Sequence, residues 1–123
     1  MSNDTNTYFT KEHFENEIRL DINEDVLKRI YNDGLKPTDQ RPINFFFVTD
    51  TEEKAILFKN YLEDNFPDYT EIEVWDYEDN FEIRGFTAPL TMDLEPINHW
   101  NQAMWDTGYS HDCVLDGWEV ETS

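Results

Sequence analysis

Apolar residues recur along the chain at two spacings, and each spacing predicts one kind of element. Residues 43–49, Ile-Asn-Phe-Phe-Phe-Val-Thr, form a dense run that is typical of a strand buried on both faces at the centre of a sheet. Residues 69–77 and 81–87 alternate apolar with polar side chains around a short polar turn, so they predict an antiparallel hairpin. A last strand is predicted over residues 111–121, with Asp116-Gly117 as a bulge or turn near its middle.

The first helix of this pattern is predicted between the dense strand and the hairpin. Asp50 is expected to cap it, Glu53 to complete a capping box, and Pro67 to end it. Its apolar stripe consists of Ala55, Phe58, Leu62 and Phe66.

The second helix is predicted between the hairpin and the last strand. Thr91 or Asp93 begins it, and Pro96 fits its first turn because a missing N–H costs little there. Gly108 is expected to end it. One face of this helix carries Leu94, Ile97, Asn101 and Met104.

The segment before the first strand predicts a pair of shorter helices. Residues 1–9 are polar, and we expect them to be frayed. Thr10 is predicted to cap one helix and Asn23 to cap another, which ends at Gly34. Residues 36–42 contain two prolines and are interpreted as a connection.

From residue 43 onward the order of elements is β-α-β-β-α-β. Right-handed crossovers place both helices of such a pattern on one face of a four-stranded antiparallel sheet. The sequence therefore predicts an α+β, ferredoxin-like domain over residues 43–123, with residues 1–42 as an N-terminal helical extension of the same domain. The other face of the sheet is then open, unless the N-terminal helices or a partner cover it.

Charge is the strongest constraint on function. The 123 residues include 28 Asp and Glu but 9 Lys and Arg, which gives a formal net charge of −19. The chain is also 15% aromatic, which argues against disorder. So acidic a surface repels nucleic acid and anionic membranes, and neither is expected as a partner. It suits a basic protein segment as the partner, although acidity can also serve solubility alone.

Cysteine content and the N-terminus indicate a compartment. The single cysteine, Cys113, allows no intrachain disulfide, so nothing points to an oxidising environment. The polar N-terminus has no apolar stretch of the kind found in signal peptides. We therefore expect a cytoplasmic protein.

Two patterns imitate metal sites without completing them. Residues 21–25 resemble the start of a calcium loop, but Val26 and Asn32 stand where such a loop needs a glycine and a glutamate. His111 and Cys113 share a face of the last predicted strand, but a structural zinc site takes four ligands. We expect neither a metal nor a cofactor.

A carboxylate-dependent hydrolase is the less favoured alternative. Asp68 and Glu71-x-Glu73 resemble a metal-dependent nuclease pattern, but Glu73 stands where that chemistry needs a lysine. An enzyme would need a concave pocket in which two or more carboxylates converge with shifted pKa values. The candidates for such a cluster are Asp76, Glu78, Asp79, Asp112 and Asp116.

Aromatic residues among carboxylates mark a candidate protein-binding surface. Trp75 and Tyr77 lie on the predicted hairpin, and such rings within a charged rim are typical of binding hot spots. Core packing is the alternative interpretation of these rings. The candidate surface comprises Trp75, Asp76, Tyr77, Glu78, Asp79, Asp112, Asp116 and Glu119.

Several short motifs resemble a known family. They are Gly85-Phe86-Thr87, the helix start Asp93-Leu94-Glu95-Pro96-Ile97-Asn98, Gly108-Tyr109, and the closing Asp116-Gly117-Trp118-Glu119. Through these motifs the chain resembles the ribonuclease E inhibitor family called RraB. The resemblance implies a ferredoxin-like domain, strong acidity, a cytoplasmic location, no cofactor, and a protein that binds the endoribonuclease and inhibits it. An immunity-type or nucleic-acid-mimic inhibitor of another basic protein is the alternative.

We interpret six motif residues as structural: Gly85, Asp93, Pro96, Asn98, Gly117 and Trp118. Gly117 is expected to permit a backbone conformation or a close approach that a side chain would block. Trp118 is then expected to anchor the final strand against a helix, while Asp116 and Glu119 project near that bend.

Overall fold

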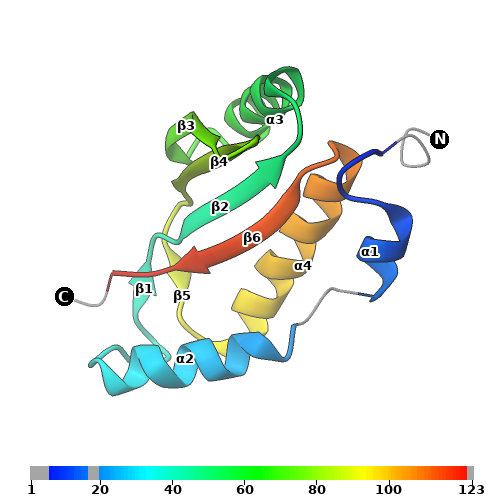
Figure 1. The fold of residues 1–123 in the computed structure, drawn as a ribbon. Helices are drawn as coiled ribbons and strands as arrows, with labels where there is room; N and C mark the ends of the chain where they lie inside the picture. The colour runs from blue at the N-terminus through cyan, green and yellow to red at the C-terminus, as the bar shows by residue number, and fades with distance from the viewer. Residues whose placement is uncertain (1–5, 17–19, 122–123) are drawn as a thin grey trace.

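The computed structural model describes residues 6–16 and 20–121, which form a sheet layer and a helix layer (Figure 1). The helices are α1 (Lys11–Asn16), α2 (Ile22–Asn32), α3 (Glu52–Asn65) and α4 (Leu94–Ser110). The strands are β1 (Gln40–Arg41), β2 (Asn44–Thr49), β3 (Thr70–Tyr77), β4 (Asn80–Phe86), β5 (Leu90–Thr91) and β6 (Val114–Glu119).

The large sheet has the strand order β3-β4-β2-β6, and each neighbouring pair is antiparallel. The ring of Phe47 on the central strand β2 shows where the long helices lie. It packs edge-on against Phe58 of α3, with 4.7 Å between ring centroids. A Cβ added to Gly108 of α4 would lie 3.0 Å from the same ring. Helices α3 and α4 therefore cover one face of the sheet, which confirms the predicted α+β architecture.

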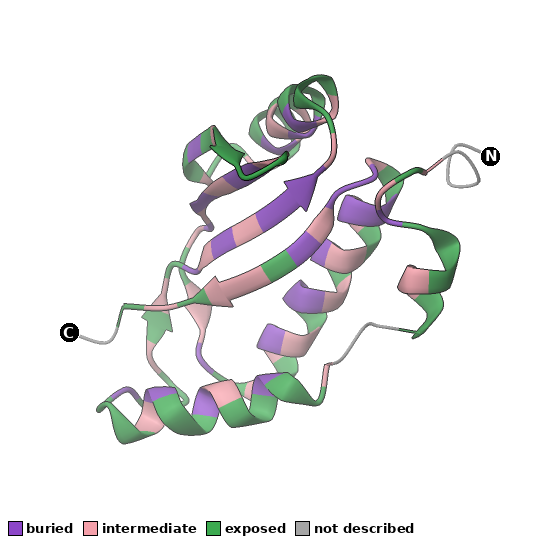
Figure 2. Ribbon diagram, viewed as in Figure 1, coloured by how far each residue is buried: buried purple, intermediate pink, exposed green. Residues whose placement is uncertain are grey.

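The hydrophobic core lies between this sheet face and the two helices (Figure 2). Strand alternation points every second side chain into it, and Phe45, Phe47 and Ile83 are fully buried. The helices contribute Ala55, Phe58, Leu62, Ile97, Trp100 and Met104. Full burial of one large apolar side chain contributes about 1.5–3 kcal/mol, so this layer is the main source of stability.

A second, two-stranded sheet occupies part of the segment predicted as a connection over residues 36–42. Strand β1 pairs antiparallel with β5, with Gln40 opposite Thr91 and Arg41 opposite Leu90. The prediction was wrong at this point because a two-residue strand is too short to show an alternation.

Helix α4 begins as its sequence predicts. Asp93 is the N-cap, its carboxylate accepts a hydrogen bond from the backbone N–H of Leu94 (3.0 Å), and Pro96 lies in the first turn. The helix runs to Ser110, past the glycine that was expected to end it. No helix within the described ranges is both long and apolar enough to cross a membrane.

The prediction that Gly108 ends the helix was wrong, because α4 continues to Ser110. A glycine is needed at position 108 because the Cys113 backbone packs closely against it. A Cβ at this position would come within 2.4 Å of the Cys113 carbonyl oxygen. The chain reverses instead at Asp112, which has a φ of 59°.

The start of α3 also differs from the expectation. Thr51 is its N-cap, and the Thr51 hydroxyl accepts a hydrogen bond from the backbone N–H of Lys54 (3.2 Å). The prediction that Asp50 caps this helix was wrong, because its carboxylate accepts hydrogen bonds from the Thr7 hydroxyl and the Lys54 ammonium instead.

Two glycines on the sheet have different surroundings. Gly85 faces the core, where a Cβ would lie 2.9 Å from the Phe45 ring and 3.0 Å from the Ile72 side chain. A Cβ at Gly117 would meet open space, and the φ of Gly117 is not in the left-handed region. The interpretation of Gly117 as a backbone requirement was therefore wrong. The predicted bulge is present at Asp116, where the register of β6 against β2 shifts.

The prediction that residues 1–9 are frayed was wrong for residues 6–9, which are held by contacts, while residues 1–5 lie outside the described residues. Phe9 is fully buried, and its ring packs against Trp105 and Tyr109 of α4 at centroid distances of 5.6 and 5.2 Å. Thr10 caps α1 as predicted, since its hydroxyl accepts a hydrogen bond from the backbone N–H of His13 (3.2 Å).

Helix α2 joins the helix layer through a residue that was predicted to cap it. Asn23 lies in the first turn instead, and it is buried. Its Nδ2 donates to Asn98 Oδ1 (2.8 Å), and its Oδ1 accepts from Trp118 Nε1 (3.2 Å). Gly34 follows the end of this helix with a φ of 114°, as the C-terminal signal predicted. That residues 1–42 form an extension of the same domain stays a prediction.

We expect Gly108→Ala to destabilise the fold by about 1–3 kcal/mol, the usual penalty of overpacking. At an uncrowded position inside a helix the same change stabilises by about 1 kcal/mol, so the sign of the effect reports the contact with the Cys113 carbonyl. Gly117→Ala is the matched control, expected within about 0.5 kcal/mol of the parent. Urea unfolding followed by tryptophan fluorescence measures the free energy of unfolding of both variants. Equal values for Gly108→Ala and Gly117→Ala would contradict this packing.

Candidate functional site

The face of the large sheet that points away from α3 and α4 carries the candidate site. Its side chains form rows across the strands, because Trp75 of β3 pairs with Glu82 of β4, and Glu82 pairs with Val48 of β2. The next row contains Glu73, Arg84 and Phe46. Apolar, acidic and basic groups therefore meet on one surface.

Two aromatic side chains are prominent on this hairpin. Trp75 is 48% exposed and Tyr77 is 43% exposed, so core packing does not describe them. The Trp75 indole N–H donates to Glu73 Oε1 (3.1 Å), which orients the ring. Large rings with one polar handle are common anchors in protein interfaces.

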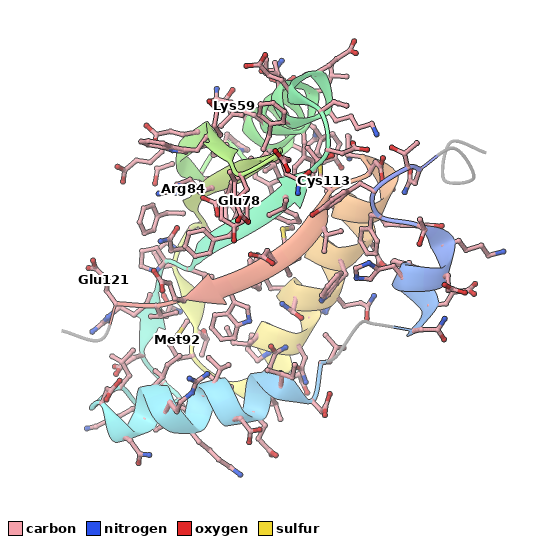
Figure 3. The ribbon with its side chains drawn as sticks, viewed as in Figure 1. Lys59, Glu78, Arg84, Met92, Cys113 and Glu121 are labelled. Carbon is pink, nitrogen blue, oxygen red and sulfur yellow. The ribbon has the colours of Figure 1, made fainter. Side chains whose placement is uncertain are left out.

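Arg84 of β4, labelled in Figure 3, contacts two rings and a carboxylate of this face. Its guanidinium carbon lies 4.8 Å from the Trp75 ring centroid and 6.0 Å from that of Phe46. Its Nε and Nη2 both donate to Glu82 Oε1, at 2.9 and 2.6 Å. Within the four strands of the large sheet, all of which the structure describes, Arg84 is the only lysine or arginine. It therefore compensates a carboxylate that is 8% exposed.

Exposed carboxylates surround the two rings. Glu78 and Asp79 form the turn of the hairpin, whereas Asp76 of β3 pairs with Phe81 and points to the helix-facing side of the sheet. Glu78 has a φ of 55°, which is uncommon for a residue with a side chain. Asp116 and Glu119 are exposed on β6, across the sheet. The hairpin thus brings together Trp75, Tyr77, Glu78 and Asp79, and two more predicted residues lie on the strand at the opposite edge. The prediction was wrong for Asp76, because alternation along β3 turns it to the other face.

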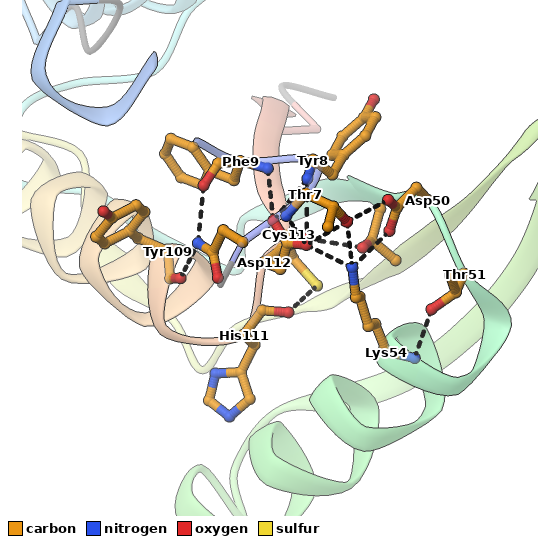
Figure 4. A network of polar contacts seen from close by, with 12 residues as sticks. Thr7, Tyr8, Phe9, Asp50, Thr51, Lys54, Tyr109, His111, Asp112 and Cys113 are labelled. Carbon is orange, nitrogen blue, oxygen red and sulfur yellow. Dashed lines mark hydrogen bonds and ion pairs between the residues drawn. The ribbon is translucent and has the colours of Figure 1, made fainter. Parts of the chain in front are cut away.

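Asp112 does not belong to this surface, although it was predicted there. It is 4% exposed, and Figure 4 shows its carboxylate inside a network with the N-terminal arm, residues 6–9. The carboxylate accepts hydrogen bonds from the Lys54 ammonium and from the backbone N–H groups of Thr7 (2.9 Å), Tyr8 (3.0 Å) and Phe9 (2.6 Å). The prediction was wrong because the sequence around Asp112 does not show that a segment a hundred residues away covers it.

The network decides the charge states of its members. Burial by itself would raise the pKa of Asp112, but the hydrogen bonds from Lys54 and from the arm outweigh burial and hold this pKa below its usual range. The pKa of Asp50 is lowered in the same way, against its burial, by Thr7 and Lys54. Burial would lower the pKa of Lys54, but its hydrogen bonds to the two carboxylates raise it.

The N-terminal arm also brings Tyr8 toward the exposed sheet face, which the sequence did not predict. Burial raises the pKa of Tyr8, and so do the charges of Asp116, Asp50 and Tyr77, which lie within electrostatic range. Tyr8 stands in a polar stretch without periodicity, so only the tertiary contact with Asp112 reveals its place.

The five carboxylates named as candidates for a hydrolase lie in different surroundings. Asp112 is engaged by Lys54 and the arm, and across the described ranges no three His, Cys, Asp or Glu side chains group to hold a metal ion. Burial raises the pKa of the Cys113 thiol to about 12, so it is a poor nucleophile at neutral pH. The His111 ring lies 4.4 Å from that of Tyr61, with Nδ1 at 2.9 Å from a backbone carbonyl.

Trp118 joins the end of β6 to the helix layer. Its ring lies edge-on to Trp100 of α4, with 6.2 Å between centroids, and its indole N–H donates to Asn23 of α2. The chain itself therefore covers Trp118 at this end of β6. The exposed rings of the β3–β4 hairpin have no such cover from the residues that the structure describes.

Comparison with known proteins gives the chain a family. The family model described as "Regulator of ribonuclease activity B", RraB, matches residues 20–120. That range holds the whole large sheet and helices α2, α3 and α4. No curated protein matches the chain closely enough to count as a relative.

We expect Asp112→Asn to lower the free energy of unfolding by about 1.5–3 kcal/mol, the usual contribution of a hydrogen bond to a charged group. The amide cannot neutralise Lys54 or accept every N–H of the arm. Asp116→Asn removes the same charge at an exposed position and serves as the control, with an effect below about 0.5 kcal/mol. Equal losses in the two variants, measured by urea unfolding, would contradict the role given to Asp112.

The difference between the parent and Asp112→Asn should also depend on pH. Because the folded pKa of Asp112 lies below the unfolded value of about 3.9, its contribution is present above about pH 4 and is lost as the pH falls through the folded pKa. The stability gap measured at about pH 7 should narrow at about pH 3. A gap that stays constant would show that shape, not charge, holds the arm.

Proposed function

The chain belongs to the RraB family, regulators of ribonuclease activity, and we propose that it binds a ribonuclease through the exposed face of its sheet. Ribonuclease E is the enzyme that the motif resemblance implies. The role is regulation by binding rather than catalysis, and its site of action is the cytoplasm.

One observation carries this proposal: two half-exposed rings stand among carboxylates on a sheet face that the long helices leave open. Trp75 and Tyr77 offer apolar area at the centre, while Glu78 and Asp79 form an acidic rim beside them at the turn of the hairpin. Binding hot spots combine a tryptophan or tyrosine anchor with a surrounding polar ring that excludes water. The arrangement therefore fits a protein partner better than a small molecule.

The net charge of −19 defines the chemistry of that partner. Opposite charges steer two proteins together and raise the rate of association, so a basic segment of the ribonuclease is the expected target. A basic segment of the ribonuclease that binds RNA cannot contact the RNA phosphates while carboxylates of this chain are bound to it. Occupation of such a segment would be enough to inhibit the enzyme.

We expect Trp75→Ala and Tyr77→Ala each to weaken binding to ribonuclease E by at least about tenfold, because hot-spot truncations cost about 2 kcal/mol or more. Both rings are exposed, so the melting temperatures should stay close to that of the parent. Isothermal titration with the purified enzyme measures the affinity.

Ile56→Ala and Leu57→Ala are the matched controls, since these side chains of α3 are 45% and 57% exposed on the helix layer. They should bind as the parent does. Raising the salt concentration should weaken the parent complex. Unchanged affinity for both ring variants, together with a loss in the α3 variants, would move the site to the helix layer.

A further inference from the structure

We propose that the exposed sheet face holds a recognition site for an arginine side chain, built from Trp75, Phe46 and Glu82. Arg84 of the chain itself fills this site until an arginine of the partner replaces it. The inference rests on the proposed function, because it names the chemical group through which the basic segment is recognised.

The contacts of Arg84 define the walls of the site. Its guanidinium carbon lies 4.8 Å from the Trp75 ring centroid and 6.0 Å from that of Phe46, which is the range of cation–π attraction. Glu82 supplies the opposite charge at 2.6 and 2.9 Å. The structure thus shows a guanidinium held by two rings and a carboxylate, so the group that the site accepts is already visible.

Arg84 pairs with only one of the two carboxylate oxygens of Glu82. Its Nε and Nη2 converge on one oxygen, Oε1, and in the described part of the chain no donor pairs with Oε2 of Glu82. Arg84 and Glu82 are two residues apart on one strand, so the guanidinium can approach only along the strand. An arginine from another chain lacks this tether and can meet both oxygens in a bidentate pair.

The burial of the two partners favours exchange over simple release. The Glu82 side chain is 10% exposed, and a carboxylate so buried is costly to leave without a cation. The Arg84 side chain is 41% exposed, so it can turn toward solvent and the carboxylate rim once another cation arrives. Glu82 then stays compensated throughout, while the incoming guanidinium gains the stack on Trp75.

The same geometry separates arginine from lysine. A planar guanidinium stacks on a ring and pairs with two oxygens at once, whereas an ammonium is a point charge that prefers its water shell. The rim carboxylates attract either cation, but the site itself should prefer arginine.

The test uses two synthetic glycine–serine peptides of equal length and charge, one with arginines and the other with lysines at the same positions. The parent should bind the arginine peptide more tightly. Arg84→Lys keeps the net charge but weakens the internal occupant, so it should bind the arginine peptide about threefold to tenfold more tightly, with the lysine peptide nearly unchanged. Isothermal titration gives each affinity, and thermal melting verifies the fold.

Arg84→Met and Lys59→Met separate the site from net charge. Both remove one cation, but Lys59 is paired with Glu63 on α3, outside the sheet face. Arg84→Met should increase the affinity for the arginine peptide more than Lys59→Met does. If the former variant melts early, the charge-preserving Arg84→Lys decides.

Three results would overturn the inference. Equal gains for both peptides, or gains no larger than those of Lys59→Met, would leave only a general acidic attraction, and the proposed ribonuclease binding would stand. Weaker binding of the arginine peptide by the Arg84 variants would make Arg84 itself the contact. Binding of neither peptide would remove the site, and the ribonuclease titration would then decide separately whether the proposed function fails too.

Discussion

The buried carboxylate of Asp112 is the constraint on which the arrangement of this molecule depends. It stands between α4 and β6 in a left-handed conformation, accepts three backbone N–H groups of the N-terminal arm, and pairs with Lys54 of α3. One ionised group thus joins the first described residues to both long helices. Because its hydrogen bonds outweigh its burial, the group stays charged at neutral pH and holds the arm there.

The two faces of the sheet differ in composition, and we propose that one serves stability and the other binding. The helix-facing side is filled by Phe45, Phe47 and Ile83, and its close packing leaves no room even for a Cβ at Gly85 or Gly108. The other side keeps aromatic rings, one arginine and many carboxylates at the surface. Rigid support from behind is useful to a binding face, because ordered side chains lose less entropy when a partner arrives.

The sequence was sufficient where a pattern repeats locally. Alternation located the β3–β4 hairpin and its exposed rings, and the dense apolar run located the central strand. It failed where one residue depends on a distant segment. Asp112 was wrongly placed on the binding surface, because the sequence does not show that the N-terminal arm covers it. Tyr8 was missed because its position depends on the same contact between the arm and Asp112. Gly117 was misread because a glycine at a bulge usually marks a backbone requirement, whereas open space surrounds it here.

We propose that the exposed face of the β3–β4 hairpin, and not the helix layer, contacts the ribonuclease. Backbone amide chemical shifts of the isotope-labelled chain, followed by NMR during titration with the basic segment of ribonuclease E, test this most directly. We expect the largest changes in chemical shift at residues 73–84, at the positions of β2 that pair with them and at the Trp75 indole N–H. Changes centred on α2 and α3, with the hairpin signals unmoved, would contradict it.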